Sequence, residues 1–189
     1  MDALKQAYYY TLDDYYNSFP EKRVELIYGK IYDMASPGTV HQRLLMRLSA
    51  LINSYIQKKG GPCEIFPGPF DVILFPDRDD VCVVPDISVI CDPKKITPKG
   101  CTGAPDFIIE IASPGNYAHD YIKKLDLYLN AGVREYWIVN PMKKTVHVYK
   151  LTDIGNDDFA PLVFGFEDKV KVGIYDDLEI DFEEVTKGI

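Results

Sequence analysis

The stretch PDFIIEIASPG, residues 105–115, combines a run of apolar and β-branched residues with a turn at its end. Such a run is typical of a buried strand. Glu110 lies in the apolar middle of this run, where an ionised carboxylate is costly unless a cation or hydrogen-bond donors compensate its charge. The stretch therefore predicts a functional site as well as a core strand.

A second apolar run, VVPDISVI at residues 83–90, also contains one acid, Asp86, directly after Pro85. The chain between Asp86 and Glu110 is long enough for one strand, a loop and entry into a neighbouring strand. Two carboxylates brought together in an apolar setting raise each other's pKa, and Mg²⁺ is a natural compensator because it prefers oxygen ligands. The alternative is structural: Asp86 would cap a loop, and Glu110 would pair with a lysine or arginine.

The segment that follows the strand with Glu110 predicts a helix. From Tyr117 to Ala131 apolar residues recur at steps of three and four, and AGV ends the helix with a glycine. The next stretch, EYWIVN at 135–140, indicates another buried strand. A strand, a helix and a strand in this order predict a parallel crossover between residues 105 and 140.

Further elements extend this unit on both sides. We expect a helix over 11–19 with a capping box of Thr11 and Asp14, a hairpin over 23–35 that turns at Gly29, and a long helix from His41 to Lys58. Strands are expected over 63–75 and 81–91, an exposed outer strand over 145–150, and edge strands within about 160–185. The predicted fold is α/β of the α+β type: a mixed central sheet flanked by helices, with additional edge hairpins, in one domain over 1–189.

Composition excludes several classes of protein. Hydrophobic residues at 47% and charged residues at 26% are globular values, and the net charge of −8 argues against a large non-specific nucleic-acid surface. No apolar run approaches the roughly 18 residues of a membrane span, so we expect a cytoplasmic protein. The cysteines lack zinc-binding spacing and are expected to be reduced structural thiols: Cys63, Cys82, Cys91 and Cys101.

A combination of motifs carries a family resemblance. In order, they are PDISVICD, GAPDFIIEIASP, the helix positions Asp120, Lys124 and Tyr128, and AGVREYWIVNP. Together they resemble the PD-(D/E)xK nuclease superfamily and, within it, a bacterial family of small restriction-endonuclease-like domains without an assigned function. The resemblance covers about 24–149. It implies a restriction-endonuclease-like core in which Asp86, Glu110 and the backbone carbonyl of Ile111 hold Mg²⁺ or Mn²⁺.

The sequence departs from the superfamily pattern at the lysine. The common pattern has lysine two positions after the glutamate, and here that position is Ala112. The resemblance implies that Lys124 on the following helix replaces it. Lys123 is the neighbouring candidate, but successive helical residues are turned by about 100°, so only one should face the carboxylates. Alone, either lysine would more often be a solvated surface residue.

Additional candidates have weaker support. Glu25 and His41 match recurrent positions of the family and could complete a metal shell or contact substrate. Asp106 lies four residues before Glu110 on the same strand face, as a supporting acid, and Asp71 is a further acidic candidate. A serine-hydrolase site with Ser113 and His119 is not supported, because there is no GxSxG motif or separate acidic partner.

These observations predict a metal-dependent endonuclease that hydrolyses phosphodiester bonds in DNA. The alternatives are a nuclease-fold binding or dimerisation module without efficient catalysis, which the acidic charge and Ala112 favour, and an RNA-directed nuclease with the same site. Homodimerisation is a further expectation, because many nucleases of the superfamily pair to cut two strands.

Overall fold

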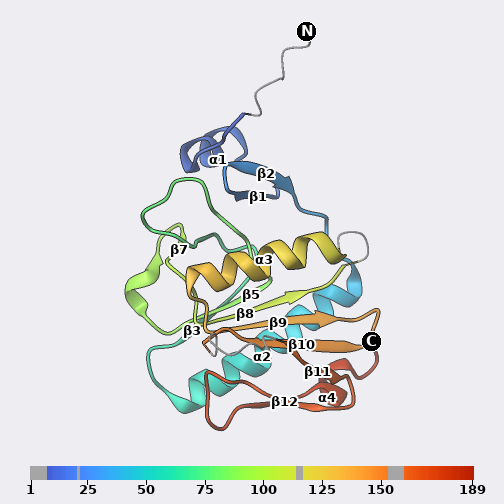
Figure 1. The fold of residues 1–189 in the computed structure, drawn as a ribbon. Coiled ribbons are helices and arrows are strands. Elements are labelled where there is room, and N and C mark those ends of the chain that lie inside the picture. Colours follow the sequence, from blue (N-terminus) through green and yellow to red (C-terminus); the bar gives the residue numbers. More distant parts are fainter. Residues whose placement is uncertain (1–7, 21, 114–116, 153–159) are drawn as a thin grey trace.

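A mixed sheet of six strands lies at the centre of the molecule (Figure 1). The computed structural model describes residues 8–20, 22–113, 117–152 and 160–189, and only the backbone of 117–122. The strand order is β11-β10-β9-β8-β5-β3, and β8 and β9 are the parallel pair. The bounds are β3 Glu64–Pro67, β5 Ile87–Ile90, β8 Phe107–Ile111, β9 Glu135–Asn140, β10 Thr145–Lys150 and β11 Leu162–Gly165.

Two helices cover opposite faces of this sheet. The long helix α2, Thr39–Lys59, packs against Phe107 and Ile109 of β8 through residues that include Leu48. Helix α3, Tyr117–Ala131, follows β8 and leads into β9, so the predicted parallel crossover is confirmed. Because successive strand residues face opposite sides, Ile108 joins the core on the α3 side, and Glu110 points the same way.

The N-terminal part of the chain forms a separate layer beside the α3 face (Figure 1). Helix α1, Leu12–Ser18, has the predicted capping box, in which Thr11 and Asp14 bond each other's backbone amides. The predicted hairpin is formed by β1, Val24–Ile27, and β2, Lys30–Asp33. Its inner strand is tied to the rest of the chain by hydrogen bonds in both directions between Leu26 and Cys82.

Short elements complete the fold, and among them the sequence pattern did not predict η1, β6, β7 and α4. The loop between β5 and β8 contains a 3₁₀ helix and two strands, which join β4 in a three-stranded sheet of order β4-β7-β6. The C-terminal part contains a two-stranded sheet and a helix. The bounds are η1 Pro93–Lys95, β4 Val72–Ile73, β6 Ile96–Thr97, β7 Gly100–Thr102, β12 Lys169–Lys171, β13 Glu179–Asp181 and α4 Phe182–Thr186.

Four expectations about strands are corrected by the structure. Residues 81–91 are not one strand, because Pro85 cannot donate to a ladder and the chain enters β5 only after Asp86. Residues 63–75 divide at the cis Gly68–Pro69 bond into β3 and β4, which belong to different sheets. Strand β10 is not the outer strand, since β11 pairs with it. Of the strands within 160–185, only β11 joins the central sheet.

The expectation of four reduced cysteines is also wrong. Cys63 and Cys91 form a disulfide, whereas Cys82 and Cys101 are buried free thiols. The cause is strand register: Glu64 pairs with Ile90, so the next pair outward brings Cys63 opposite Cys91, with their Cα atoms 3.8 Å apart. Spacing along the chain gives no sign of this pairing, because it depends on which strands become neighbours.

None of the helices in the described parts of the chain has both the length and the apolar character needed to span a membrane.

Candidate active site

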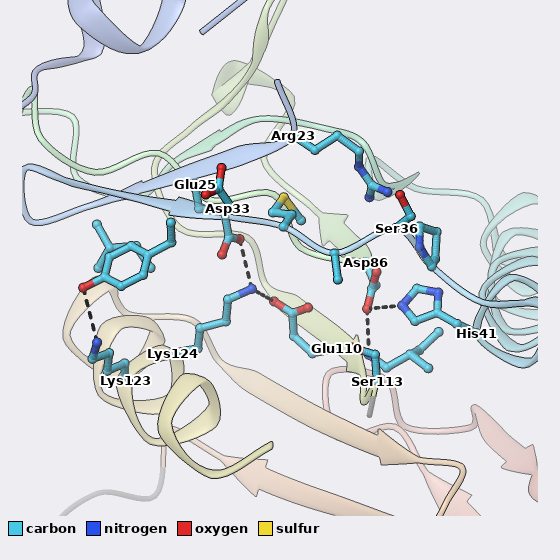
Figure 2. A pocket seen from close by; sticks show the side chains of 16 residues that line it. Arg23, Glu25, Asp33, Ser36, His41, Asp86, Glu110, Ser113, Lys123 and Lys124 are labelled. Atoms are coloured by element: carbon cyan, nitrogen blue, oxygen red, sulfur yellow. Dashed lines mark hydrogen bonds and ion pairs between the residues drawn. The ribbon is translucent and has the colours of Figure 1, made fainter. Parts of the chain in front are cut away.

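The two predicted carboxylates lie side by side at the ends of neighbouring strands (Figure 2). Strands β5 and β8 are antiparallel with Ile87 opposite Ile109, so one further step places Asp86 beside Glu110. The amide of Ile111 donates to Oδ2 of Asp86 at 2.8 Å, which fixes Asp86 against β8. The strand pairing therefore brings together two acids that are distant in sequence.

Lys124 lies between Glu110 and a third carboxylate, Glu25. Its Nζ atom donates to Oε1 of Glu110 at 2.8 Å and to Oε1 of Glu25 at 2.9 Å. Glu25 comes from β1 and is 5% exposed, and its Oε1 also accepts the amide of Val84 at 2.9 Å. The ammonium thus joins the hairpin layer, the central sheet and helix α3 at one point (Figure 2).

Each central carboxylate has one oxygen held by protein donors and one oxygen without such a partner. Oε1 of Glu110 also accepts the Tyr128 hydroxyl at 2.7 Å, and Oδ2 of Asp86 lies 3.1 Å from Nε2 of His41. Within the described residues, neither Oε2 of Glu110 nor Oδ1 of Asp86 has a hydrogen bond from the protein. These two oxygens are free to bind a ligand.

Burial and neighbouring charges shift the protonation equilibria here. Burial raises the pKa of Glu110, and Asp86 and Glu25 add to this rise while Lys124 opposes it. Burial would lower the pKa of Lys124, but Glu110 and Glu25 outweigh it, so the pKa lies above its ordinary value. Burial also raises the pKa of Tyr128, followed by the charge of Glu110. Lys124 therefore stays cationic, and Tyr128 stays a hydrogen-bond donor.

Glu25, Asp86, Glu110 and Lys124 line a cavity of about 190 Å³. Its walls come from the β1–β2 hairpin, the connection from β2 to α2, the ends of β5 and β8, and helix α3. His41 reaches Asp86 from the first turn of α2, and its Nδ1 atom is buried without a hydrogen-bond partner among the described residues. Since Nε2 faces a carboxylate, Nε2 is the nitrogen that carries the hydrogen.

The other predicted residues lie at different places. Lys123 lines the cavity and donates to the Tyr32 hydroxyl at 3.2 Å, not to the central carboxylates. Asp106 accepts the amide of Cys91 at 2.8 Å and Nη1 of Arg134 at 3.1 Å, so it ties strands together outside the cavity. Asp71 accepts the Tyr15 hydroxyl at 3.2 Å in the N-terminal layer.

Three other residues considered from the sequence are Ser113, His119 and Asp120. Ser113 lines the cavity, and the side chains of His119 and Asp120 lie outside the described residues. Sequence reasoning missed Arg23, Asp33 and Ser36 of the cavity wall, and no local pattern distinguishes them from surface residues. Tyr128 entered as the third position of the helix pattern with Asp120 and Lys124; its ring packs against Tyr136, and its hydroxyl donates to Glu110. The four-residue step from Lys124 to Tyr128 was the available signal, because such a step places both on one helix face.

The donor set fits a divalent cation bound largely through water. Within the described parts of the chain, no group of three or more His, Cys, Asp and Glu side chains is arranged to hold a metal ion. Two carboxylate oxygens are nevertheless sufficient for Mg²⁺, which usually keeps several waters and takes one or two carboxylates. When all three acids are ionised, Asp86, Glu110 and Glu25 face the single charge of Lys124. The two uncompensated negative charges match one divalent ion.

Comparison with known proteins agrees with this arrangement. The chain superposes on the crystal structure of a "putative nuclease belonging to DUF820" from Anabaena variabilis with a TM-score of 0.75 and 26% identity, over 94% of this chain and 97% of the other. The fold is therefore that of a nuclease-like protein. Residues 8–179 match the model of the Uma2 family, described as "Putative restriction endonuclease", and the chain belongs to this family.

A curated relative matches over a shorter range. It is the uncharacterized protein slr1290 of Synechocystis sp., which is 29% identical over 129 residues. The match covers 68% of this chain and 66% of the relative, slightly less than two thirds of its length.

Proposed function

We propose that this protein hydrolyses phosphodiester bonds in DNA as an endonuclease that requires Mg²⁺ or Mn²⁺. The observation that carries the proposal is the Lys124 ammonium, held between Glu110 and Glu25 beside Asp86 in the lining of a cavity. A lysine next to two strand-end carboxylates is the charge arrangement that phosphodiester hydrolysis needs, because negative charge increases on the phosphate in the transition state. The family description and the nuclease neighbour support the same reaction class.

Asp86 and Glu110 would hold the ion through their unpartnered oxygens, together with the carbonyl of Ile111. The bound ion would supply Lewis acidity and lower the pKa of a nearby water. Lys124 is cationic and acts as an electrostatic group: it faces the phosphate and stabilises the charge that develops there. Glu25 and Tyr128 hold the Lys124–Glu110 pair in place. Glu25 accepts a hydrogen bond from Lys124, and Tyr128 donates one to Glu110.

A non-catalytic binding module is the second candidate. The net charge of −8 and Ala112, at the position where the superfamily has lysine, favour it. This candidate predicts that the protein binds no Mg²⁺ or Mn²⁺ and cleaves no substrate. An RNA-directed nuclease would use the same residues, and parallel DNA and RNA substrates distinguish the two. Homodimerisation also stays a prediction.

Metal binding is the first test. Isothermal titration of Mn²⁺ and Mg²⁺ into the wild type should give a saturable signal that Asp86→Ala/Glu110→Ala abolishes. The matched control is Asp126→Asn, which removes an exposed acid from α3 and should leave binding unchanged. Absence of binding to the wild type, both alone and with oligonucleotide, would select the non-catalytic module.

Cleavage is the second test. Lys124→Met keeps the length of the side chain and removes its charge, so we expect cleavage of labelled DNA to fall by about 10²-fold, in the range for loss of one transition-state donor. Lys58→Met, an exposed residue in the last turn of α2, is the control and should retain full activity. Equal cleavage by Lys124→Met and the wild type would disprove the role of Lys124.

A further inference from the structure

The carboxylates are recessed in the cavity and not displayed on a surface ridge. The segment from Asp33 to Pro37, which connects β2 to α2, lines the cavity together with Glu110 and Lys124. At one side, Lys123 of α3 reaches Tyr32 of β2, with Nζ 3.2 Å from the hydroxyl and 4.7 Å from the ring centroid. This contact joins α3 to the β1–β2 hairpin beside the cavity.

The site groups are largely buried, so a substrate phosphate has to enter the cavity to reach them: the side chains of Lys124 and Glu110 are 12% and 9% exposed. About 190 Å³ is below the roughly 300–1,000 Å³ of a typical small-molecule pocket. A phosphate oxygen has to come within about 2.1 Å of a Mg²⁺ ion held there. Duplex DNA is stiff, with a persistence length of about 150 base pairs, so moving one of its phosphates inward past the hairpin requires bending or kinking, which costs free energy. A single strand can move a phosphate inward by rotating about its backbone bonds, without this cost.

Two cations lie on either side of the central pair. Arg23 extends toward Ser36 on one side of the cavity, and Lys123 lies on the other, with Lys124 and Glu110 between them (Figure 2). Within the described residues the Arg23 guanidinium has no hydrogen bond or ion pair with protein. A scissile phosphate beside Lys124 would place the phosphates before and after it near these cations.

We propose that the site acts on an unpaired strand, with Arg23 and Lys123 binding the phosphates that flank the scissile one. The inference rests on the proposed function and specifies its substrate. The charge balance agrees with it, because an acidic protein with two or three cations at its site offers little to the dense charge of a duplex. Arg23 and Lys123 are positioning residues, so their loss should raise KM and leave kcat nearly unchanged.

The experiment uses one labelled oligonucleotide in three forms: single strand, blunt duplex, and a fork with one duplex and one unpaired arm. We expect kcat/KM for the single strand to exceed that for the duplex at least about tenfold, and cuts in the fork to map to the unpaired arm. Binding is measured separately by fluorescence anisotropy without divalent metal, over a series of salt concentrations.

Matched variants assign the contacts. Arg23→Gln and Lys123→Gln should each weaken single-strand binding and reduce the slope of log K against log salt by about 0.7, the value for one phosphate contact on a single strand. Lys58→Gln is the control, because Lys58 is exposed and roughly 25 Å along α2 from His41. It should leave affinity and slope unchanged.

The outcomes separate this inference from the proposed function. Equal cleavage of duplex and single strand would overturn the inference and leave the nuclease function standing. Unchanged salt slopes in both variants would overturn the roles of Arg23 and Lys123. Preferential binding of the single strand without cleavage would retain the strand preference and overturn the hydrolytic function. Neither binding nor cleavage of any form would overturn both.

Discussion

At the scale of single residues, the carboxylate of Glu110 is the central feature. Lys124 and Tyr128 both bond its Oε1 atom, and this leaves Oε2 without a partner among the described residues. Two donors on one oxygen fix the rotation of the carboxylate, because they leave its other oxygen only one direction in which to point. The sequence indicated that the charge of Glu110 needed compensation, and the structure shows which donors surround it.

Tyr128→Phe tests this positioning role. It removes the hydroxyl and retains the ring that packs against Tyr136, so the thermal unfolding midpoint should change little. With one of its two donors lost, Glu110 should bind Mn²⁺ more weakly, by about tenfold to a hundredfold, as expected when a metal ligand loses a hydrogen-bond partner. Isothermal titration measures this change.

A matched control for this substitution is Tyr175→Phe. The Tyr175 hydroxyl is buried but has no hydrogen-bond partner among the described residues. Its removal should therefore leave Mn²⁺ affinity unaltered. If Tyr128→Phe binds Mn²⁺ like the wild type, the hydroxyl has no part in positioning Glu110.

At the scale of elements, periodicity explains how β8 and α3 meet at the site. Alternation along β8 sends Ile109 toward α2 and Glu110 toward α3, and the step of four from Lys124 to Tyr128 sends both side chains back toward the strand. Both periods can be read from the sequence. The position of Glu25 beside Lys124 cannot be read from the sequence, because no local pattern indicates which strand will pack against α3.

Asp80, a buried carboxylate that is bonded to the N-terminal layer, makes the stability of the fold depend on pH. Asp80 is 2% exposed, and Arg78 bonds both of its oxygens, through Nε at 2.8 Å and Nη2 at 2.6 Å, while the Tyr9 hydroxyl adds a further bond. The hydrogen bonds from Arg78 hold the pKa of Asp80 below its ordinary value, against the opposing effect of burial. The carboxylate form is therefore the one that stabilises the fold.

Asp80→Asn should lower the free energy of unfolding by about 1–3 kcal/mol at pH 7, the cost of disturbing a buried hydrogen-bonded group. Because the folded pKa of Asp80 lies below the unfolded value, this contribution is complete above about pH 4 and is lost as the pH falls through the folded pKa. Urea unfolding at several pH values should show the wild type and the variant converging in acid. A constant difference down to acid pH would contradict this account.

At the scale of the whole molecule, a covalent link secures one edge of the central sheet. The disulfide between Cys63 and Cys91 joins β3, the edge strand, to β5, and it closes a loop with a sequence separation of 28. A cross-link of this length stabilises chiefly by restricting the unfolded chain. Because β5 follows Asp86, the link also holds the strand that positions one of the site carboxylates.

Reduction of this disulfide should destabilise the protein by about 2–4 kcal/mol. Thermal unfolding with and without dithiothreitol measures the effect, and thiol titration of the denatured chain should rise from the two free cysteines to all four. The variant Cys63→Ser/Cys91→Ser should resemble the reduced wild type and show no response to dithiothreitol. An unchanged midpoint after complete reduction would disprove the stabilising role.

Elements that depend on local patterns could be predicted from the sequence. The capping box at Thr11, the hairpin turn at Gly29 and the helix Tyr117–Ala131 were all predictable, because propensity and hydrophobic period act over a few neighbouring residues. The fold class followed from their order, and the resemblance added Lys124, Glu25 and His41 to the two carboxylates already indicated by the strands. The break at Pro85 was underestimated, since a run of β-branched residues outweighed one proline in the prediction.

Contacts between residues that are distant in sequence became apparent only in the folded chain. It separates Lys124, which faces two carboxylates, from Lys123, which faces Tyr32, and it places Asp106 with Arg134 outside the cavity. It also pairs two of the four cysteines. These outcomes depend on strand order, register and the path of the hairpin across the sheet. Such long-range contacts are fixed by packing of the whole chain, so short stretches of sequence do not contain them.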